Sequence, residues 1–91
     1  MNVKNMMQQL SRSSDLTDTP LPGLSIAEIV DDKRVLIENH RGVIHYSEEN
    51  ICVRTRFGQI WVEGLGLELV KMSKQQLVIV GTITCVKLMR G

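Results

Sequence analysis

The stretch VLIENHRGVIHYSEENICVRTRFGQIWV, residues 35–62, decides the fold of this chain. Apolar and polar residues alternate through it with a period of two, and glycine-bearing turns break it twice. This alternation is typical of consecutive antiparallel strands that bury one face. The residues after 62 repeat the pattern, so the sequence predicts a small all-β domain.

The first predicted hairpin joins residues 35–38 to residues 43–46 through the loop 39–42. Within that loop, Asn39 and Gly42 are the residues best able to adopt a positive φ. The hairpin would place four side chains on one core-facing side, namely Val35, Ile37, Ile44 and Tyr46.

The second predicted hairpin turns at Phe57 and Gly58. Its inner pairs are Thr55 with Ile60 and Val53 with Val62, and its outer pairs are Arg54 with Trp61 and Cys52 with Glu63. A slip of one residue would bury Arg54, so the alternation fixes which face is inside.

The rest of the chain divides into a leader, residues 1–20, and a single β domain, residues 21–91. In the domain, Leu24 and Ile26 start a short strand, the segment 64–66 makes a hairpin turn, and Gly81 makes a bulge or tight bend. We predict an antiparallel meander that folds into a two-layer sheet or an open barrel. A short β-solenoid is the alternative, because similar tripeptides start at Gly42 and Gly58, sixteen residues apart.

The leader contains one short apolar pattern, formed by Val3, Met6, Met7 and Leu10 at helical spacing. A Ser/Thr/Asp-rich linker follows it. An isolated helix of this length is marginal in water. The sequence therefore leaves two interpretations open, a flexible leader or a helix that docks on a partner or a membrane surface.

Composition argues against several classes of function. Lys and Arg number 11 and Asp and Glu number 10, so the formal charge is +1 and gives no field to attract nucleic acid or an anionic membrane. The sequence shows neither a membrane-spanning apolar run nor a signal peptide. We expect a cytoplasmic protein that reaches a membrane only through a partner.

No residue pattern predicts catalysis, a cofactor or a metal site. His40 and His45 lack further metal ligands at a recognisable spacing, and Cys52 with His45 lacks a third group to complete a nucleophilic site. Cys52 and Cys85 are expected to be buried free thiols of a reducing compartment. We therefore expect a protein that is not an enzyme.

Two surfaces remain as candidates for binding. Arg54, Arg56 and Trp61 would suit single-stranded nucleic acid, although a cation–π pair across the strands explains them equally well. The balanced charge argues against nucleic acid as a partner. The outward positions after Trp61 are unusually apolar. We predict an interaction face formed by Arg54, Trp61, Val70, Val78 and Val80, covered by a folded-over layer or by a protein partner.

Three parts of the sequence together resemble the YabP/YqfC family of small sporulation proteins, most closely its YqfC branch. They are IENHRG at 37–42 followed by Ser47-Glu48, then the spaced residues Thr55, Gly58, Ile60, Val62 and Gly64, and finally Gly81 and Ile83. The similarity covers roughly residues 21–88.

The resemblance implies a protein of the mother-cell compartment of endospore-forming bacteria that is needed for spore morphogenesis. Members of the YqfC type are commonly paired with a membrane protein, YqfD, and the family has no assigned catalytic residues. Glu38, Asn39, His40 and Gly42 match the family motif, and they either build the turn or bind a partner.

We therefore expect a non-enzymatic adaptor or assembly module with a membrane-protein partner, and unpaired strand edges also allow homo-oligomers. The alternative is a small nucleic-acid- or ligand-binding β-barrel.

Overall fold

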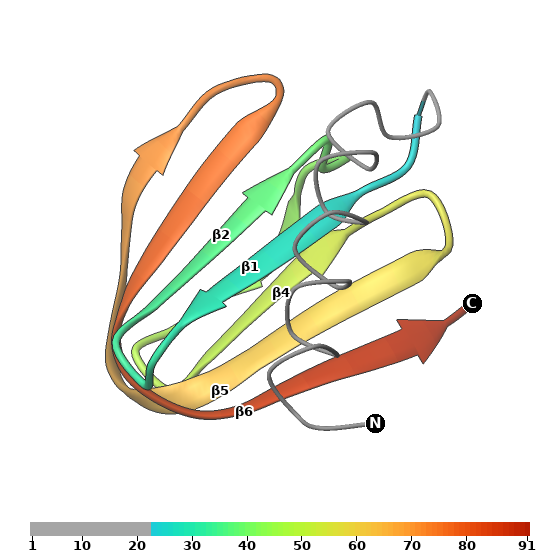
Figure 1. The fold of residues 1–91 in the computed structure, drawn as a ribbon. Coiled ribbons are helices and arrows are strands. Elements are labelled where there is room, and N and C mark those ends of the chain that lie inside the picture. The colour runs from blue at the N-terminus through green and yellow to red at the C-terminus, as the bar shows by residue number, and fades with distance from the viewer. Residues whose placement is uncertain (1–22) are drawn as a thin grey trace, which may run out of the picture.

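The computed structural model describes residues 23–91, which form six antiparallel strands and no helix (Figure 1). The strands are β1 (Ile26–Val30), β2 (Arg34–Glu38), β3 (Val43–Tyr46), β4 (Asn50–Arg54), β5 (Gly58–Met72) and β6 (Gln76–Arg90). Their order in the sheet is β1-β2-β6-β5-β4-β3. The all-β prediction is confirmed, whereas the leader at 1–20 and the domain boundary beside it lie outside the described residues.

The two long strands, β5 and β6, bend together at one corner of the molecule (Figure 1). Their register shifts three times along this bend, as expected where bulges curve a sheet. At Gly81 the φ angle is +141°, and a Cβ atom would lie 2.8 Å from the carbonyl oxygen of Gly66. The predicted bend at Gly81 is confirmed.

The predicted hairpin turn at 64–66 is wrong, because β5 runs through these residues without reversing. Gly64 and Leu65 keep their pairing with β6. A Cβ atom on Gly64 would collide with the carbonyl oxygen of Thr82 on that neighbouring strand. Only glycine, which has no Cβ, therefore allows β5 and β6 to approach this closely at Gly64.

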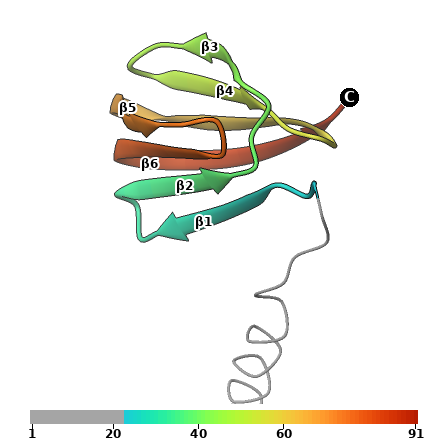
Figure 2. The same cartoon turned by 90° about the horizontal axis from the view of Figure 1, so that it is seen from above.

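The bend divides the sheet into two layers that share one core. Figure 2 shows the strands side by side, from β3 at one edge of the sheet to β1 at the other. The first layer contains β3, β4, residues 58–63 of β5 and residues 85–90 of β6. The second layer contains β1, β2, residues 76–80 of β6 and residues 68–72 of β5. The buried side chains from both layers form one cluster, namely Val35, Ile37, Ile51, Val53, Ile60, Val62, Leu67, Leu77, Ile79 and Ile83.

The first predicted hairpin is wrong, because β2 and β3 do not pair. β2 lies between β1 and β6, and β3 pairs with β4. The loop 39–42 instead carries the chain from the second layer to the first, where Arg54 donates its backbone N–H to the Gly42 carbonyl oxygen at 2.8 Å. Val35 and Ile37 are buried as predicted, whereas Ile44 and Tyr46 are exposed near a bulge in β3.

The second predicted hairpin exists, but its register differs by two residues. Val53 pairs with Ile60, and the Thr55 N–H donates to the Gly58 carbonyl oxygen at 2.8 Å, so residues 56–57 make the turn. A shift of two preserves the face of every side chain. The predicted inner positions of Val53, Ile60 and Val62 are therefore confirmed, and these residues are buried.

The turns at 31–33 and 47–49 both accept backbone hydrogen bonds from the bent parts of β5 and β6. The β1–β2 turn accepts hydrogen bonds from the backbone amides of Gly81 and Ile83, at 3.1 and 2.7 Å. The β3–β4 turn accepts them from Gly64 and Leu67, at 3.0 and 2.8 Å. The β1–β2 hairpin thus packs on β6 as the β3–β4 hairpin packs on β5.

The two tripeptides spaced by sixteen residues lie at the starts of β3 and β5, because Gly42 precedes Val43 and Gly58 is the first residue of β5. These two strands are not neighbours in the sheet, and every pair of neighbouring strands is antiparallel. A β-solenoid would instead stack its repeats as parallel strands. The β-solenoid alternative is therefore wrong.

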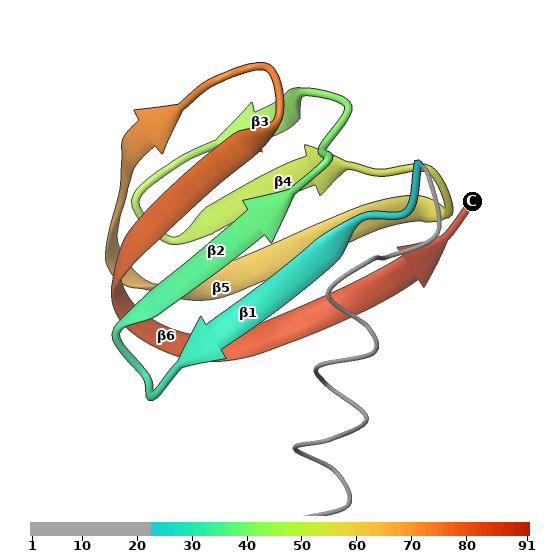
Figure 3. The same ribbon diagram turned by 45° about the horizontal axis from the view of Figure 1, so that its top comes forward.

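The two layers leave two seams along the sides of the core. We call the side between β3 and residues 67–72 of β5 the closed seam, because Tyr46 reaches across it and its hydroxyl accepts a hydrogen bond from the Leu69 N–H at 3.3 Å. We call the side between β1 and residues 82–90 of β6 the open seam. Figure 3 shows β1 and this half of β6 separating with distance from the corner.

Candidate functional site

The loop 39–42 ties three parts of the chain together. Asn39 has a φ of +59°, and Gly42 also has a positive φ, as predicted. The Asn39 amide Nδ2 donates to the Leu24 carbonyl oxygen at 2.9 Å, the Ser25 hydroxyl donates to the Asn39 carbonyl oxygen at 2.9 Å, and the Asn39 N–H donates to the Gln75 carbonyl oxygen. One residue therefore fixes both the start of β1 and the β5–β6 turn.

His40 lies in this loop as predicted, but it is buried and does not project from the surface. Its Nδ1 accepts a hydrogen bond from the Gly42 N–H at 3.0 Å. Its Nε2 lies 2.8 Å from the Ser73 carbonyl oxygen, which can only accept. These two contacts require a neutral ring with its proton on Nε2. The imidazole therefore acts as a cross-link between the loop and the β5–β6 turn.

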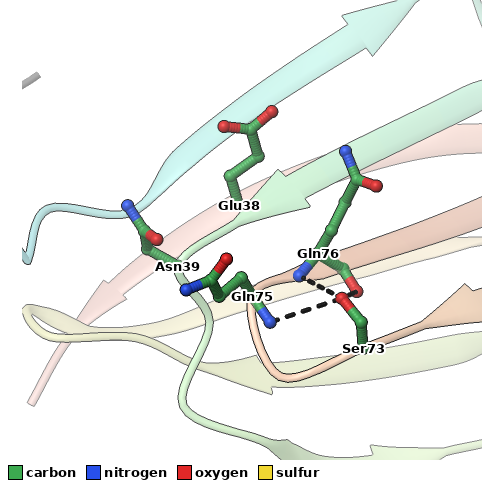
Figure 4. Close-up of a pocket in the computed structure, with 5 residues that line it drawn as sticks. All are labelled: Glu38, Asn39, Ser73, Gln75 and Gln76. Carbon is green, nitrogen blue, oxygen red and sulfur yellow. Dashed lines mark hydrogen bonds between the residues drawn. The ribbon is translucent and has the colours of Figure 1, made fainter. Parts of the chain in front are cut away.

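A polar pocket of about 330 Å³ opens beside this cross-link (Figure 4). It is lined by Glu38, Asn39, Ser73, Gln75 and Gln76. The Ser73 hydroxyl oxygen accepts hydrogen bonds from the backbone amides of Gln75 and Gln76, at 3.4 and 3.1 Å. The hydroxyl is thus occupied in shaping the turn, and Glu38 is the only charged group among the described residues that line the pocket.

The outer face of the first layer carries a row of three side chains from adjacent strands. Cys52 lies between His45 and Trp61, and the two rings approach with centroids 6.1 Å apart. The Gln59 Oε1 accepts hydrogen bonds from Trp61 Nε1 at 3.0 Å and from the Cys52 thiol at 3.6 Å. The predicted pairing of Arg54 with Trp61 is wrong, because Arg54 lies opposite Gln59.

The two cysteines differ in environment. Both are free thiols, but Cys52 is buried and Cys85 is exposed, so burial is confirmed for the first alone. Burial raises the pKa of the Cys52 thiol, and the positive charge of Arg54 offsets part of that rise. A raised pKa keeps the thiol protonated, which is the opposite of what a reactive cysteine needs. Cys52 and His45 are neighbours, but this geometry does not activate the sulfur.

The predicted interaction face is divided by the bend. Arg54 and Trp61 project from the outside of the first layer, where they alternate with buried Val53 and Ile60. Val78 and Val80 alternate with buried core residues on the outside of the second layer, and Val70 occupies a bulge of β5 in that layer. The five residues therefore do not form one surface.

Beside Val78 and Val80, the structure places residues that the sequence did not single out. On the outside of the second layer, a shallow depression of about 240 Å³ is lined by Glu28, Val30, Arg34, Leu36 and Val78. We call this surface, together with Val80 beside Arg34, the outer apolar face. Alternation within β2 already predicts that the Leu36 side chain projects from the opposite face to Val35 and Ile37. The sequence alone could therefore have identified Leu36 as an outward apolar residue.

Within residues 23–91, no three His, Cys, Asp or Glu side chains converge in a way that could hold a metal ion. No helix in this part of the chain has the length and apolar character needed to cross a bilayer.

Comparison with known proteins gives a match over most of the chain. Residues 25–91 match the model of the YabP family. The matched range contains all six strands and the loop 39–42. No curated protein and no solved structure was found to match the chain.

Proposed function

Because the chain belongs to the YabP family, which is associated with sporulation, we propose that it is a non-enzymatic assembly module of spore formation. In this proposal the chain is of the YqfC type and acts in the mother-cell cytoplasm. Its partner is a membrane protein of the YqfD type, which holds it at the membrane.

The outer apolar face is the observation that supports this proposal. The solvated side of an antiparallel sheet is normally polar. Here three adjacent strands present Val30, Leu36 and Val78 on that side. Such a contiguous apolar surface is typical of a protein interaction site.

The charged residues around the face indicate which charges a partner would place opposite them. Glu28 and Arg34 both line the depression, and Val30 and Leu36 lie among them. A complementary protein surface would present apolar side chains to the centre, with a basic group opposite Glu28 and an acidic group opposite Arg34. Burial of apolar area would contribute about 25 cal/mol per Å² before the costs of association are subtracted.

The test measures the mass of the full chain in solution, alone and with the soluble portion of the membrane partner. A complex should form, and Val78→Glu should weaken it at least about tenfold because it places a carboxylate on the apolar face beside Leu36. Leu65→Glu is the matched control, since Leu65 is exposed at the corner and lies off this face. Its complex should keep the affinity of the parent chain.

Two results would contradict the proposal. The first is a chain that stays monomeric and ignores the partner at every concentration. The second is binding to single-stranded nucleic acid with steep salt dependence, which would favour the β-barrel alternative. Concentration-dependent self-association that Val78→Glu abolishes would support the assembly role and identify a second copy as the occupant of the face.

A further inference from the structure

The open seam contains apolar side chains that point toward the core side and still lie in solvent. Ile29 on β1 pairs with buried Val35, and Leu88 on β6 pairs with buried Ile60, so both occupy core-facing positions. Their exposed fractions are nevertheless 55% and 66%. No described residue covers the core at this side.

The seam is also hollow near the corner. An open depression of about 460 Å³ there is lined by Ile29, Asp31 and Asp32 on one side and by residues 83–86 on the other. Neither β1 nor the half of β6 after residue 82 has a second strand partner within residues 23–91. The seam therefore offers an apolar floor between two unpaired edges.

The chain enters the described structure at the wide end of this seam. A Cβ atom built on Gly23 would lie 3.2 Å from a guanidinium nitrogen of Arg56, in the β4–β5 turn. The same turn accepts a hydrogen bond from the Gly91 N–H through the Phe57 carbonyl oxygen, so it lies beside the end of β6. Gly23, the first described residue, therefore lies beside the turn that contacts the end of β6.

The segment 3–10 has the composition that such a seam requires. Val3, Met6, Met7 and Leu10 repeat at helical spacing, and methionine side chains adapt to irregular apolar surfaces. Lys4 is the only charged residue among residues 1–10, whereas the corner end of the seam carries Asp31 and Asp32, of which Asp32 is also paired with Lys33 at 3.6 Å. The twelve residues 11–22 can extend about 40 Å, which is ample for the segment to lie along the seam.

We propose that residues 3–10 bind the open seam of their own chain as a short helix. Its apolar side chains cover Ile29 and Leu88, and Lys4 lies toward Asp31 and Asp32. The tertiary contact supplies the stabilisation that a helix of this length lacks in isolation. This inference concerns a different surface from the outer apolar face and does not depend on the proposed function.

Hydrogen exchange on the full chain tests the proposal. The amides of residues 6–10 should exchange at least about tenfold more slowly than unstructured amides, because the helix is held by the seam. Leu88→Glu should return them to unstructured rates. Met72→Glu is the matched control, since Met72 also pairs with a buried residue at the end of a bent strand and is 59% exposed, but on β5. It should leave the protection of residues 6–10 unchanged.

The measurement is repeated over a tenfold range of protein concentration. Protection that is independent of concentration and sensitive to Leu88→Glu supports the proposal. Unprotected amides at residues 6–10 would overturn it, as would protection that Leu88→Glu leaves intact. Protection that grows with concentration would also overturn it, since the segment would then bind a second copy.

Discussion

The closed seam and the open seam are built on the same plan and end differently. In each, a two-stranded hairpin packs on a long bent strand, and its turn accepts two hydrogen bonds from the bend. In the closed seam, Tyr46 bridges to the backbone of the opposite edge and Leu67 is fully buried. In the open seam, Ile29 and Leu88 occupy core-facing positions and remain exposed. The comparison indicates that the second seam is the side of the domain that needs cover.

The largest expected effect is the loss of packing beneath the closed seam. Leu67→Ala removes a fully buried side chain and leaves a cavity, so unfolding free energy should fall by about 3 kcal/mol. Denaturant unfolding measures the change. Leu65→Ala is the control on the same bend, because Leu65 is 64% exposed, and it should change stability by less than about 0.5 kcal/mol. Equal effects at the two positions would contradict the burial described for this seam.

The next effect concerns the corner that both seams share. Gly64→Ala would force a methyl group against the Thr82 carbonyl oxygen, so it should destabilise the fold by roughly 2 kcal/mol. Thermal unfolding measures it. Gly66→Ala is the comparison, because its Cβ meets open space and its cost of about 1 kcal/mol comes only from the left-handed φ of +60°. A Gly64 variant as stable as the parent chain would show that the strands can separate at the corner without penalty.

A smaller effect should follow from removing the bridge of the closed seam. Tyr46→Phe deletes the hydroxyl that accepts from Leu69, and this exposed hydrogen bond should contribute about 0.5 kcal/mol. Hydrogen exchange is the sharper measurement, because the Leu69 amide should lose protection while the Leu67 amide keeps its bond to the Glu48 carbonyl oxygen. Unchanged exchange at Leu69 would mean that Tyr46 does not close the seam.

The smallest effect is the loss of stability at alkaline pH that the Cys52 thiol causes. The two thiols should also differ in their reactivity. Cys85 is exposed and lies opposite Glu63 on the outside of the first layer, so it should react with iodoacetamide well before buried Cys52. Burial raises the pKa of Cys52 above its ordinary value of 9.0. Above pH 9 the unfolded thiol therefore ionises before the folded one, and stability should fall with rising pH. Cys52→Ala should reduce the fall of unfolding free energy with rising pH above pH 9. An unchanged pH dependence in this variant would contradict the role given to Cys52.

The sequence predicted the strand faces better than the strand partners. Period-two alternation sorted Val53, Ile60 and Val62 to the inside although the register was wrong by two residues, because an even shift preserves the faces. The loop 39–42 has the positive φ values of a hairpin turn, yet it crosses between layers. Its deciding contacts, from Asn39 to Gln75 and from His40 to Ser73, join residues more than thirty positions apart, and no local pattern reveals them.

The candidate interaction face shows the same limit of local patterns. Alternation correctly indicated that Trp61 and Val78 project away from the core. It does not indicate whether the two side chains lie on the same outer surface of the molecule. That depends on the bend in β5, and two glycines within three residues had predicted a reversal of the chain there. A strand that bends and a strand that ends have similar local sequences, and only the pairing with β6 distinguishes them.

The pairing of β2 with β6 also has a consequence for the order of folding. The β3–β4–β5 portion consists of neighbours in sequence and can assemble early, whereas β2 must wait for a strand separated from it by three others. Such long-range closure slows folding, to times on the order of milliseconds to seconds for small β proteins. Until β6 has been synthesised, the β1–β2 hairpin has no sheet to join, and its unpaired edge is open to aggregation. The chain is therefore most prone to aggregation during its translation, before β6 is available to complete the second layer.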